Sequence, residues 1–166
     1  MAQIAHTDRL VLRHYAASDA DTVARLIGDY AVSQWLTSVP YPYERADALA
    51  FFDEHGSNDR VCAVTYDDRL IGCVSILGEL GYWYGAPFWG QGFATEAAQA
   101  LLDVHFSGCD ADVASGYLSG NTGSRRVLEK LGFVETEQRS TYCLSRKCDV
   151  ANHKMVLTHA AWRARQ

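Results

Sequence analysis

The sequence lacks any apolar run that approaches about 18 residues, the length that a helix needs to cross a bilayer. Residues 1–13 also lack the apolar stretch that forms the centre of a secretion signal. From these two absences we expect a cytoplasmic protein that neither crosses nor binds a membrane.

The five cysteines do not have the spacing of a disulfide framework or a zinc site. Their count is odd, and no two of them form a C-x-x-C pair. We therefore expect no bound metal, a reducing compartment and small buried side chains at these positions, which are Cys62, Cys73, Cys109, Cys143 and Cys148.

Positive charge is also in short supply. Fifteen Lys and Arg residues against 20 Asp and Glu residues give a formal net charge of −5, which argues against nucleic-acid binding by bulk electrostatic attraction. The 166 residues are 48% hydrophobic and 21% charged, which is ordinary for one globular domain with a substantial core. We expect residues 1–166 to form a single α/β domain.

Hydrophobic periodicity and turn residues predict a mixture of helices and strands. Predicted strands cover residues 9–15, 60–66, 69–77, 79–84, 112–118, 133–141 and 153–158, and predicted helices cover 19–30, 44–55, 94–106 and 124–131. The strands between residues 60 and 84 follow one another as an antiparallel meander. Only strand 79–84, helix 94–106 and strand 112–118 have the order of a β-α-β crossover, so these two strands are expected to be parallel neighbours.

The turn between that strand and that helix is rich in glycine. In WGQGFATE (89–96), Gly90 and Gly92 allow positive φ or close approach of a ligand, and the N–H groups of residues 91–95 point outward from the helix start. Such a helix start binds phosphate without a lysine. The lysine of a P-loop is missing, and Thr95 replaces the third glycine of a dinucleotide fingerprint. The open alternative is a tight turn that binds nothing.

A second signal follows strand 112–118. Asn121 and Ser124 stand at the start of the next predicted helix, and either side chain could cap that helix. The alternative is that Asn121 donates a hydrogen bond to a ligand lying between the two parallel strands.

Together these passages resemble the GNAT acetyltransferase superfamily, in particular its RimJ/RimL-like N-acetyltransferases. The resemblance rests on TDRLVLR (7–13), GYWY (81–84), WGQGFATEA (89–97), N-x-x-S-x-x-V-L-E-K-L-G-F (121–133) and LTHAAW (157–162). It implies an α/β fold of the α+β type. Its sheet would be mixed and mostly antiparallel, with seven strands that splay between the fourth and the fifth, and about four helices would pack on both faces.

The resemblance also implies acetyl-CoA as the co-substrate. Its pantetheine arm would lie between strands 79–84 and 112–118, and its pyrophosphate would lie at the superfamily's R/Q-x-x-G-x-G/A loop, which maps onto Trp89, Gly92 and Ala94. The residues implied to bind the cofactor are Trp83, Tyr84, Trp89, Gly90, Gln91, Gly92, Phe93, Ala94, Thr95, Asn121 and Ser124. The candidates to contact its 3′-phosphate are Arg125, Arg126 and Lys130.

The implied reaction is direct attack of a neutral primary amine on the thioester. A main-chain N–H near Trp83 or Tyr84 would stabilise the oxyanion. The candidate base is Glu79, which opens the same strand, and the other choice is His14.

The acid that protonates the departing thiolate needs a separate assignment. Many superfamily members use a tyrosine from the short helix after the N-x-x-A/S motif, but Leu128 stands at the corresponding position here. Ser124 is the first candidate for this role and Tyr117 is the second.

Recognition of the acceptor is assigned to two variable segments, residues 31–43 and 138–148. Trp35, Tyr41 and Tyr43 could wall a narrow amine tunnel, or they could be ordinary core. The expected acceptor is a protein N-terminal amine or a small-molecule amine, and homodimers are expected for this branch. Two other classes of protein stay open: a non-catalytic acyl-CoA-binding module, and a nucleotide-binding fold of another type.

Overall fold

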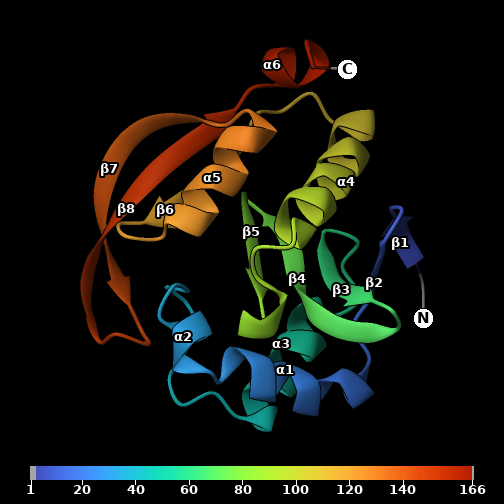
Figure 1. Cartoon of the computed structure of the whole chain (residues 1–166), viewed down its shortest axis with the longest axis vertical. Coiled ribbons are helices and arrows are strands. Elements are labelled where there is room, and N and C mark those ends of the chain that lie inside the picture. The colour runs from blue at the N-terminus through green and yellow to red at the C-terminus, as the bar shows by residue number, and fades with distance from the viewer. Residues whose placement is uncertain (1–2, 166) are drawn as a thin grey trace.

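The computed structural model describes residues 3–165, in which an eight-stranded sheet carries helices on both faces (Figure 1). The strands are β1 (Gln3–His6), β2 (Leu10–Arg13), β3 (Val61–Tyr66), β4 (Arg69–Leu77), β5 (Glu79–Tyr84), β6 (Val113–Leu118), β7 (Val134–Cys143) and β8 (Cys148–Leu157). The α-helices are α1 (Ala20–Ile27), α2 (Tyr30–Ser33), α3 (Arg45–His55), α4 (Phe93–Gly108), α5 (Thr122–Leu131) and α6 (His159–Arg163). Residues 1, 2 and 166 of the predicted domain lie outside the described residues.

The strand order is β1-β2-β3-β4-β5-β6-β8-β7. Neighbouring strands are antiparallel except β5 and β6, which are parallel and pair at a single register position, Glu79 with Ala114. The sheet therefore opens between these two strands, which confirms the predicted mixed fold and the place of its splay. The described sheet has eight strands rather than seven, because β1 pairs with β2 and is too short for periodicity to reveal.

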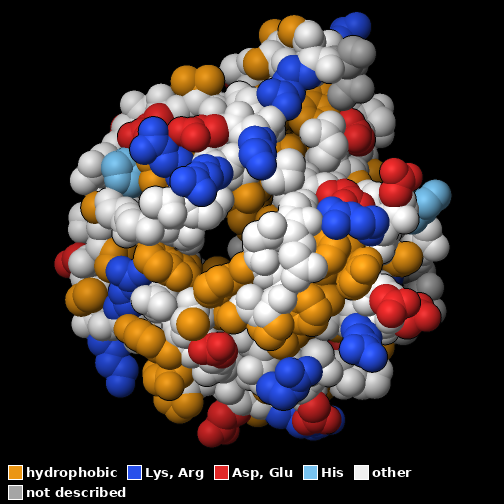
Figure 2. Space-filling model, in the orientation of Figure 1, with side chains coloured by type: hydrophobic (Ala, Val, Ile, Leu, Met, Phe, Trp, Pro, Cys, Tyr) orange, Lys and Arg blue, Asp and Glu red, His pale blue; other side chains and the backbone are white. Residues whose placement is uncertain are grey.

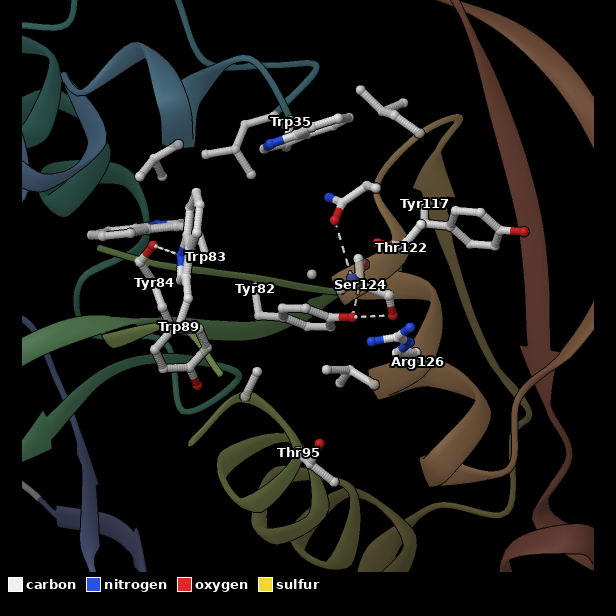
Figure 3. A pocket seen from close by; sticks show the side chains of 18 of the residues that line it. Trp35, Tyr82, Trp83, Tyr84, Trp89, Thr95, Tyr117, Thr122, Ser124 and Arg126 are labelled. Carbon is white, nitrogen blue, oxygen red and sulfur yellow. Dashed lines mark hydrogen bonds between the residues drawn. The ribbon is translucent and has the colours of Figure 1, made fainter. Parts of the chain in front are cut away.

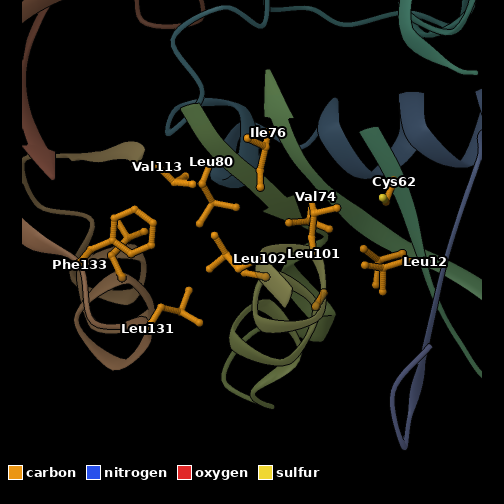
Figure 4. Packing of buried hydrophobic residues seen from close by; sticks show 14 of the residues in the cluster. Leu12, Cys62, Val74, Ile76, Leu80, Leu101, Leu102, Val113, Leu131 and Phe133 are labelled. Carbon is orange, nitrogen blue, oxygen red and sulfur yellow. The ribbon is translucent and has the colours of Figure 1, made fainter. Parts of the chain in front are cut away.

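Each face of the sheet has its own core. On one face, Leu101 and Leu102 of α4 join Val74 of β4 in a buried cluster that also includes side chains of α5 (Figure 4). On the other face, Val23 and Ile27 of α1 lie in a second cluster with residues of α3, β3 and β4. The buried residues of α4 and α1 recur at helical spacing, as expected for amphipathic helices on a sheet.

Two predicted boundaries differ from the structure. The predicted helix 19–30 ends at Ile27, and the side chain of Asp29 accepts a hydrogen bond from the Ala31 N–H at 2.9 Å, so a separate short helix, α2, begins there. The last two strands are longer than predicted and form one hairpin that includes residues 138–148. The prediction missed this because β7 is mostly exposed and polar residues interrupt the apolar alternation of both strands. The described part of the chain has six α-helices rather than about four, because α2 and α6 add two short ones.

Within residues 3–165, no helix is long and apolar enough to cross a bilayer. In the same residues, no group of three or more His, Cys, Asp or Glu side chains is placed to hold a metal ion. The five cysteines are free thiols. Three are buried and Cys109 is half-buried, but Cys148 is exposed at the start of β8, so the expectation of a buried side chain is wrong for Cys148.

Candidate active site

A cavity of about 730 Å³ occupies the opening between β5 and β6. Figure 2 shows a hollow at the centre of this face of the molecule, with hydrophobic side chains around it. Its lining comes from β5, the turn that follows it, the start of α4, β6 and α5, and from α2 with the loop after it. The opening in the sheet is therefore a space of the size that small-molecule ligands occupy.

Most of the residues predicted to bind a cofactor line this cavity. Those that do so are Trp83, Tyr84, Trp89, Gly90, Gly92, Phe93, Ala94, Thr95, Asn121 and Ser124. Gln91 does not line it, because its side-chain amide turns back and donates to the Pro87 carbonyl oxygen at 3.0 Å. The two motifs identified in the sequence thus meet at one place, although about 30 residues separate them.

The glycine turn has the backbone geometry that its sequence predicts. Gly90 and Gly92 have φ values of 73° and 83°, which lie in the left-handed region, and Gly92 is the residue from which α4 starts. The N–H groups of Phe93, Ala94 and Thr95 open this helix and have no carbonyl partner inside it. Together with the helix dipole, they make a site for an anion at the edge of the cavity.

An ion pair between Arg9, which directly precedes β2, and Glu96 of α4 holds this turn in place. The Arg9 guanidinium donates to the Glu96 carboxylate at 2.8 and 2.5 Å and to the Gln91 carbonyl oxygen at 3.1 Å, and it lies over the Phe93 ring. Partial burial favours the protonated form of Glu96, but hydrogen bonds from Thr7 and Arg9 and the Arg9 charge outweigh it and lower the pKa of Glu96. Neither residue was identified from the sequence as part of this site.

The start of α5 lies across the opening from β5. The Asn121 side-chain oxygen accepts a hydrogen bond from the Ser124 N–H at 3.1 Å and so caps α5, which is the structural alternative weighed for Asn121. Asn121 also lines the cavity. The Ser124 hydroxyl lies 2.9 Å from the Tyr82 phenol oxygen, which also donates to the Ser124 carbonyl oxygen at 3.2 Å (Figure 3).

Tyr82 is another residue of this site that the sequence analysis did not identify. Its ring lines the cavity from β5 and reaches α5 across the opening. Burial raises the pKa of Tyr82 well above its ordinary value, although the hydrogen bond with Ser124 opposes this shift. The phenol therefore stays protonated at neutral pH. The alternation of β5, which puts residues 80, 82 and 84 on one face, is the signal that could have identified it.

The other predicted catalytic groups are already engaged. The Lys154 ammonium contacts both oxygens of the Glu79 carboxylate, at 2.5 and 2.6 Å, at the edge of the cavity. The Tyr117 ring lines the cavity, but its hydroxyl points away from it and donates to the Glu135 carboxylate at 3.0 Å (Figure 3). His14 lies outside the cavity lining, where its ring pairs with the Asp59 carboxylate at 2.8 Å.

The three aromatic residues predicted to contact the acceptor do not lie together. Trp35 lines the cavity, and its ring is covered by the Arg146 guanidinium at 4.6 Å from the ring centroid. Tyr41 is exposed and packs edge-on against Tyr30, outside the cavity. Tyr43 packs against the core beneath α1 and α3, where burial raises its pKa to about 12. The structure thus places only Trp35 at the cavity.

The β7–β8 hairpin holds the segment that carries Trp35. The Leu144 N–H donates to the Thr37 carbonyl oxygen at 3.0 Å, and the Ser145 hydroxyl donates to the Ser33 carbonyl oxygen at 2.8 Å. The Arg146 side chain adds a hydrogen bond to the Gln34 carbonyl oxygen at 2.7 Å. The two segments predicted to recognise the acceptor, residues 31–43 and 138–148, therefore contact each other beside the cavity.

Three basic side chains of α5 were predicted near a phosphate. Arg126 and Lys130 line the cavity, whereas Arg125 pairs with Glu129 on the helix surface at 2.8 Å. Leu128, at the position where many superfamily members have a tyrosine, is fully buried in the core.

Comparison with known proteins agrees with this geometry. The family model described as an acetyltransferase (GNAT) domain matches residues 9–134, which include the glycine turn, Asn121 and Ser124.

The chain belongs to the GNAT acetyltransferase family.

Other GNAT proteins resemble it along most of their length. The chain is 27% identical over 143 residues to the uncharacterized N-acetyltransferase p20 of Bacillus licheniformis, over 77% of this chain and 80% of that protein. A GNAT-family acetyltransferase structure from Bacillus anthracis matches with a TM-score of 0.83 at 19% identity, covering 94% of this chain and 98% of the other. RimL, a ribosomal L7/L12 α-N-protein acetyltransferase solved with coenzyme A, matches with a TM-score of 0.75 at 15% identity, covering 95% and 98%. At these identities the structural likeness shows the GNAT fold alone.

Proposed function

We propose that this GNAT protein transfers the acetyl group of acetyl-CoA to a primary amine, as a single domain of the RimJ/RimL-like branch acting in the cytoplasm. The observation that carries the proposal is the cavity in the β5–β6 opening, directly beside the amides that begin α4. A thioester arm fits the opening, and a pyrophosphate fits the amides. The sequence motifs from residues 7–13, 81–84, 89–97 and 121–133 support the choice of branch.

Main-chain groups supply most of the proposed cofactor contacts. The N–H groups of Phe93, Ala94 and Thr95 bind the pyrophosphate, and the free edge of β5 pairs with the amides of the pantetheine arm. Arg126 and Lys130, which line the cavity from α5, are proposed to contact the 3′-phosphate. Because the pyrophosphate contacts are main-chain, Trp89 can stand where much of the superfamily has Arg or Gln. Its indole N–H donates to the Tyr84 carbonyl oxygen at 2.7 Å and so fixes the turn.

The proposed chemistry is one nucleophilic substitution at the thioester carbonyl. The amine nitrogen forms a bond to the carbonyl carbon, the carbon–sulfur bond breaks, and the products are an amide and CoA thiol. A main-chain N–H of β5 near Trp83 or Tyr84 stabilises the oxyanion. Glu79 accepts the proton of the ammonium through a water, which requires its ion pair with Lys154 to open.

Ser124 is the proposed donor of a proton to the departing thiolate, and its oxygen regains a proton from the attacking nitrogen, which loses one as the amide forms. Its hydroxyl lies at the opening and is held there by Tyr82. The Tyr117 hydroxyl, by contrast, points away from the cavity to Glu135, which favours Ser124 over Tyr117 for this role.

The test is an assay of CoA thiol release by the purified full chain with acetyl-CoA and a panel of peptide and small-molecule amines, alongside calorimetric titration with acetyl-CoA. Amine-dependent thiol release supports the proposal. Tight acetyl-CoA binding without turnover would instead identify an acyl-CoA-binding module. Thermal protection by ATP or NAD but not by CoA would identify a different nucleotide-binding protein.

A further inference from the structure

The cavity has two sides, which differ in chemistry. Along β5, Tyr82 faces α4 and α5, where the cofactor is proposed to bind. Trp83 faces the opposite side of the sheet and packs against the core under α1 and α3 (Figure 3). Trp35 lies on this same side. We call this second side of the cavity the acceptor chamber, because an amine must reach the thioester from the face that the cofactor leaves free.

Asn152 of β8 lines this cavity and has a buried atom without a partner. Its register partner on β6 is Leu118, and it lies on the same strand face as Lys154, which contacts Glu79. Among residues 3–165, the Asn152 side-chain oxygen is one of three buried side-chain polar atoms without a hydrogen bond. A buried acceptor without a donor is unfavourable. This oxygen is enclosed against Gly116 of β6, so the Asn152 carboxamide must turn over before a ligand N–H in the cavity can reach it.

Gly116 makes room for this side chain. A Cβ at Gly116 would lie 2.7 Å from the Asn152 side-chain oxygen and 2.8 Å from the His153 carbonyl oxygen, and real side chains do not approach that closely. Because Gly116 has no side chain, the Asn152 carboxamide can lie over β6 beside the opening.

The other residues that line the cavity beside Trp35 and Trp83 are mostly apolar, and they offer no free carboxylate to a second cation. Of the lining residues described, Glu79 is the sole acid, and Lys154 holds both of its oxygens. One face of Trp35 is already covered by the Arg146 guanidinium, which adds positive charge beside the chamber. Desolvating a second ammonium here would be costly, because no partner is available for it.

We infer that Asn152 is a specificity-determining residue whose carboxamide turns over so that its side-chain oxygen accepts an N–H of the acceptor. We infer also that the acceptor is a primary amine whose amine-bearing carbon carries an apolar group and no second cation. This inference rests on the proposed acetyl transfer. Trp35 and Trp83 contact the apolar group, and the lone carboxamide orients the amine without competing for its proton.

The experiment compares leucinamide and phenylalaninamide with lysinamide and spermidine, by thiol release and by tryptophan fluorescence titration of the CoA complex. We expect kcat/KM for the two apolar amides to be at least about tenfold higher, as expected from a polar or charged mismatch in an apolar pocket. Equal or better use and binding of lysinamide or spermidine would overturn the inference. Selective binding of the apolar amides without thiol release would support the inferred specificity and contradict the proposed acetyl transfer. Binding of none of the four amines would contradict both.

Substitutions at Asn152 make the test specific. Asn152→Leu should raise the KM for leucinamide about tenfold or more while leaving acetyl-CoA affinity unchanged, because one buried hydrogen bond is lost. Asn152→Asp keeps the shape of the side chain and adds a negative charge, so it should shift the preference toward lysinamide. It also tests the position if the Leu variant fails to fold. The control is Asp149→Asn, an exposed change on the same strand. An unchanged KM and an unchanged preference in both Asn152 variants would overturn the role of Asn152.

Discussion

The Tyr82 phenol oxygen lies 2.9 Å from the Ser124 hydroxyl oxygen, and the two side chains reach each other from opposite sides of the β5–β6 opening. This contact connects the strand that carries the proposed oxyanion donor with the helix that carries the proposed acid. It also brings a tyrosine hydroxyl into the site of a GNAT protein that has Leu128 at the usual tyrosine position.

Ser124→Ala should lower kcat more than it weakens acetyl-CoA binding. Removing a positioned proton donor costs about a hundredfold or more in turnover, whereas the hydroxyl contributes little to holding the cofactor. Steady-state kinetics and calorimetry measure the two effects, with Ser140→Ala on the exposed face of β7 as the control. Normal turnover in the Ser124 variant would remove Ser124 from the mechanism.

Tyr82→Phe keeps the buried ring and removes only the hydroxyl that positions Ser124. We expect kcat to fall about tenfold, less than in Ser124→Ala, with the KM for acetyl-CoA nearly unchanged. In the double variant, the Tyr82 change should add little, because its effect passes through Ser124. Tyr142→Phe, at a tyrosine that is 55% exposed, is the control. Additive losses would show that Tyr82 acts independently of Ser124.

Gly92→Val should abolish acetyl-CoA binding while the protein remains folded. Gly92 has a φ of 83°, where a β-branched residue is strained, so the turn and the first amides of α4 would be displaced. The matched control is Gly108→Val at the other end of α4, where an added Cβ meets nothing within 4 Å. Calorimetric titration gives the affinity, and an unchanged dissociation constant would contradict the phosphate site.

Two variants of Asn121 separate its capping role from a ligand contact. Asn121→Ala removes both, so we expect a loss of about 1 kcal/mol in stability and about 1–2 kcal/mol in CoA binding. Asn121→Ser keeps an oxygen that can cap α5 and removes the amide donor. If Asn121 contacts the cofactor, the Ser variant should regain stability but not CoA affinity. Full recovery of both would show that Asn121 only caps the helix.

The Arg9–Glu96 brace predicts a pH-dependent contribution to stability. Because the folded protein lowers the pKa of Glu96 below its ordinary value of 4.5, the ionised carboxylate stabilises the fold above that pH, and the contribution is lost as the pH falls through the lowered value. The difference in Tm between wild type and Glu96→Gln should be largest near pH 7 and shrink on acidification. Asp53→Asn, exposed on α3, is the control, and a pH-independent difference would contradict the prediction.

Local chemistry allowed the backbone geometry of the glycine turn to be predicted. Gly90, Gly92 and the helix that follows them form a short continuous segment, so its backbone geometry could be inferred from residue types alone. The brace from Arg9 to Glu96 joins residues 87 positions apart and leaves no local pattern. Alternation places residues 80, 82 and 84 on one face of β5, but which face meets α5 depends on the packing of distant elements.

The side of the cavity that is proposed to bind the acceptor was harder to predict, because its residues come from distant segments. Trp35, Tyr41 and Tyr43 look alike in the sequence, but only Trp35 is held at the cavity, by a contact from Arg146 on a distant hairpin. Asn152 stands in a strand whose alternation is masked by polar residues, and its significance depends on the space left over Gly116.

The single register pair between β5 and β6 has a mechanical consequence. The molecule consists of two half-sheets, β1–β5 and β6–β8, whose facing edges share almost no main-chain bonds along the cavity. A ligand with amide groups that binds between the halves would connect them. Each main-chain hydrogen bond that it makes to a strand edge replaces a hydrogen bond to water. Deuterium uptake along residues 80–84 would then record occupancy directly, even for a ligand that never reacts.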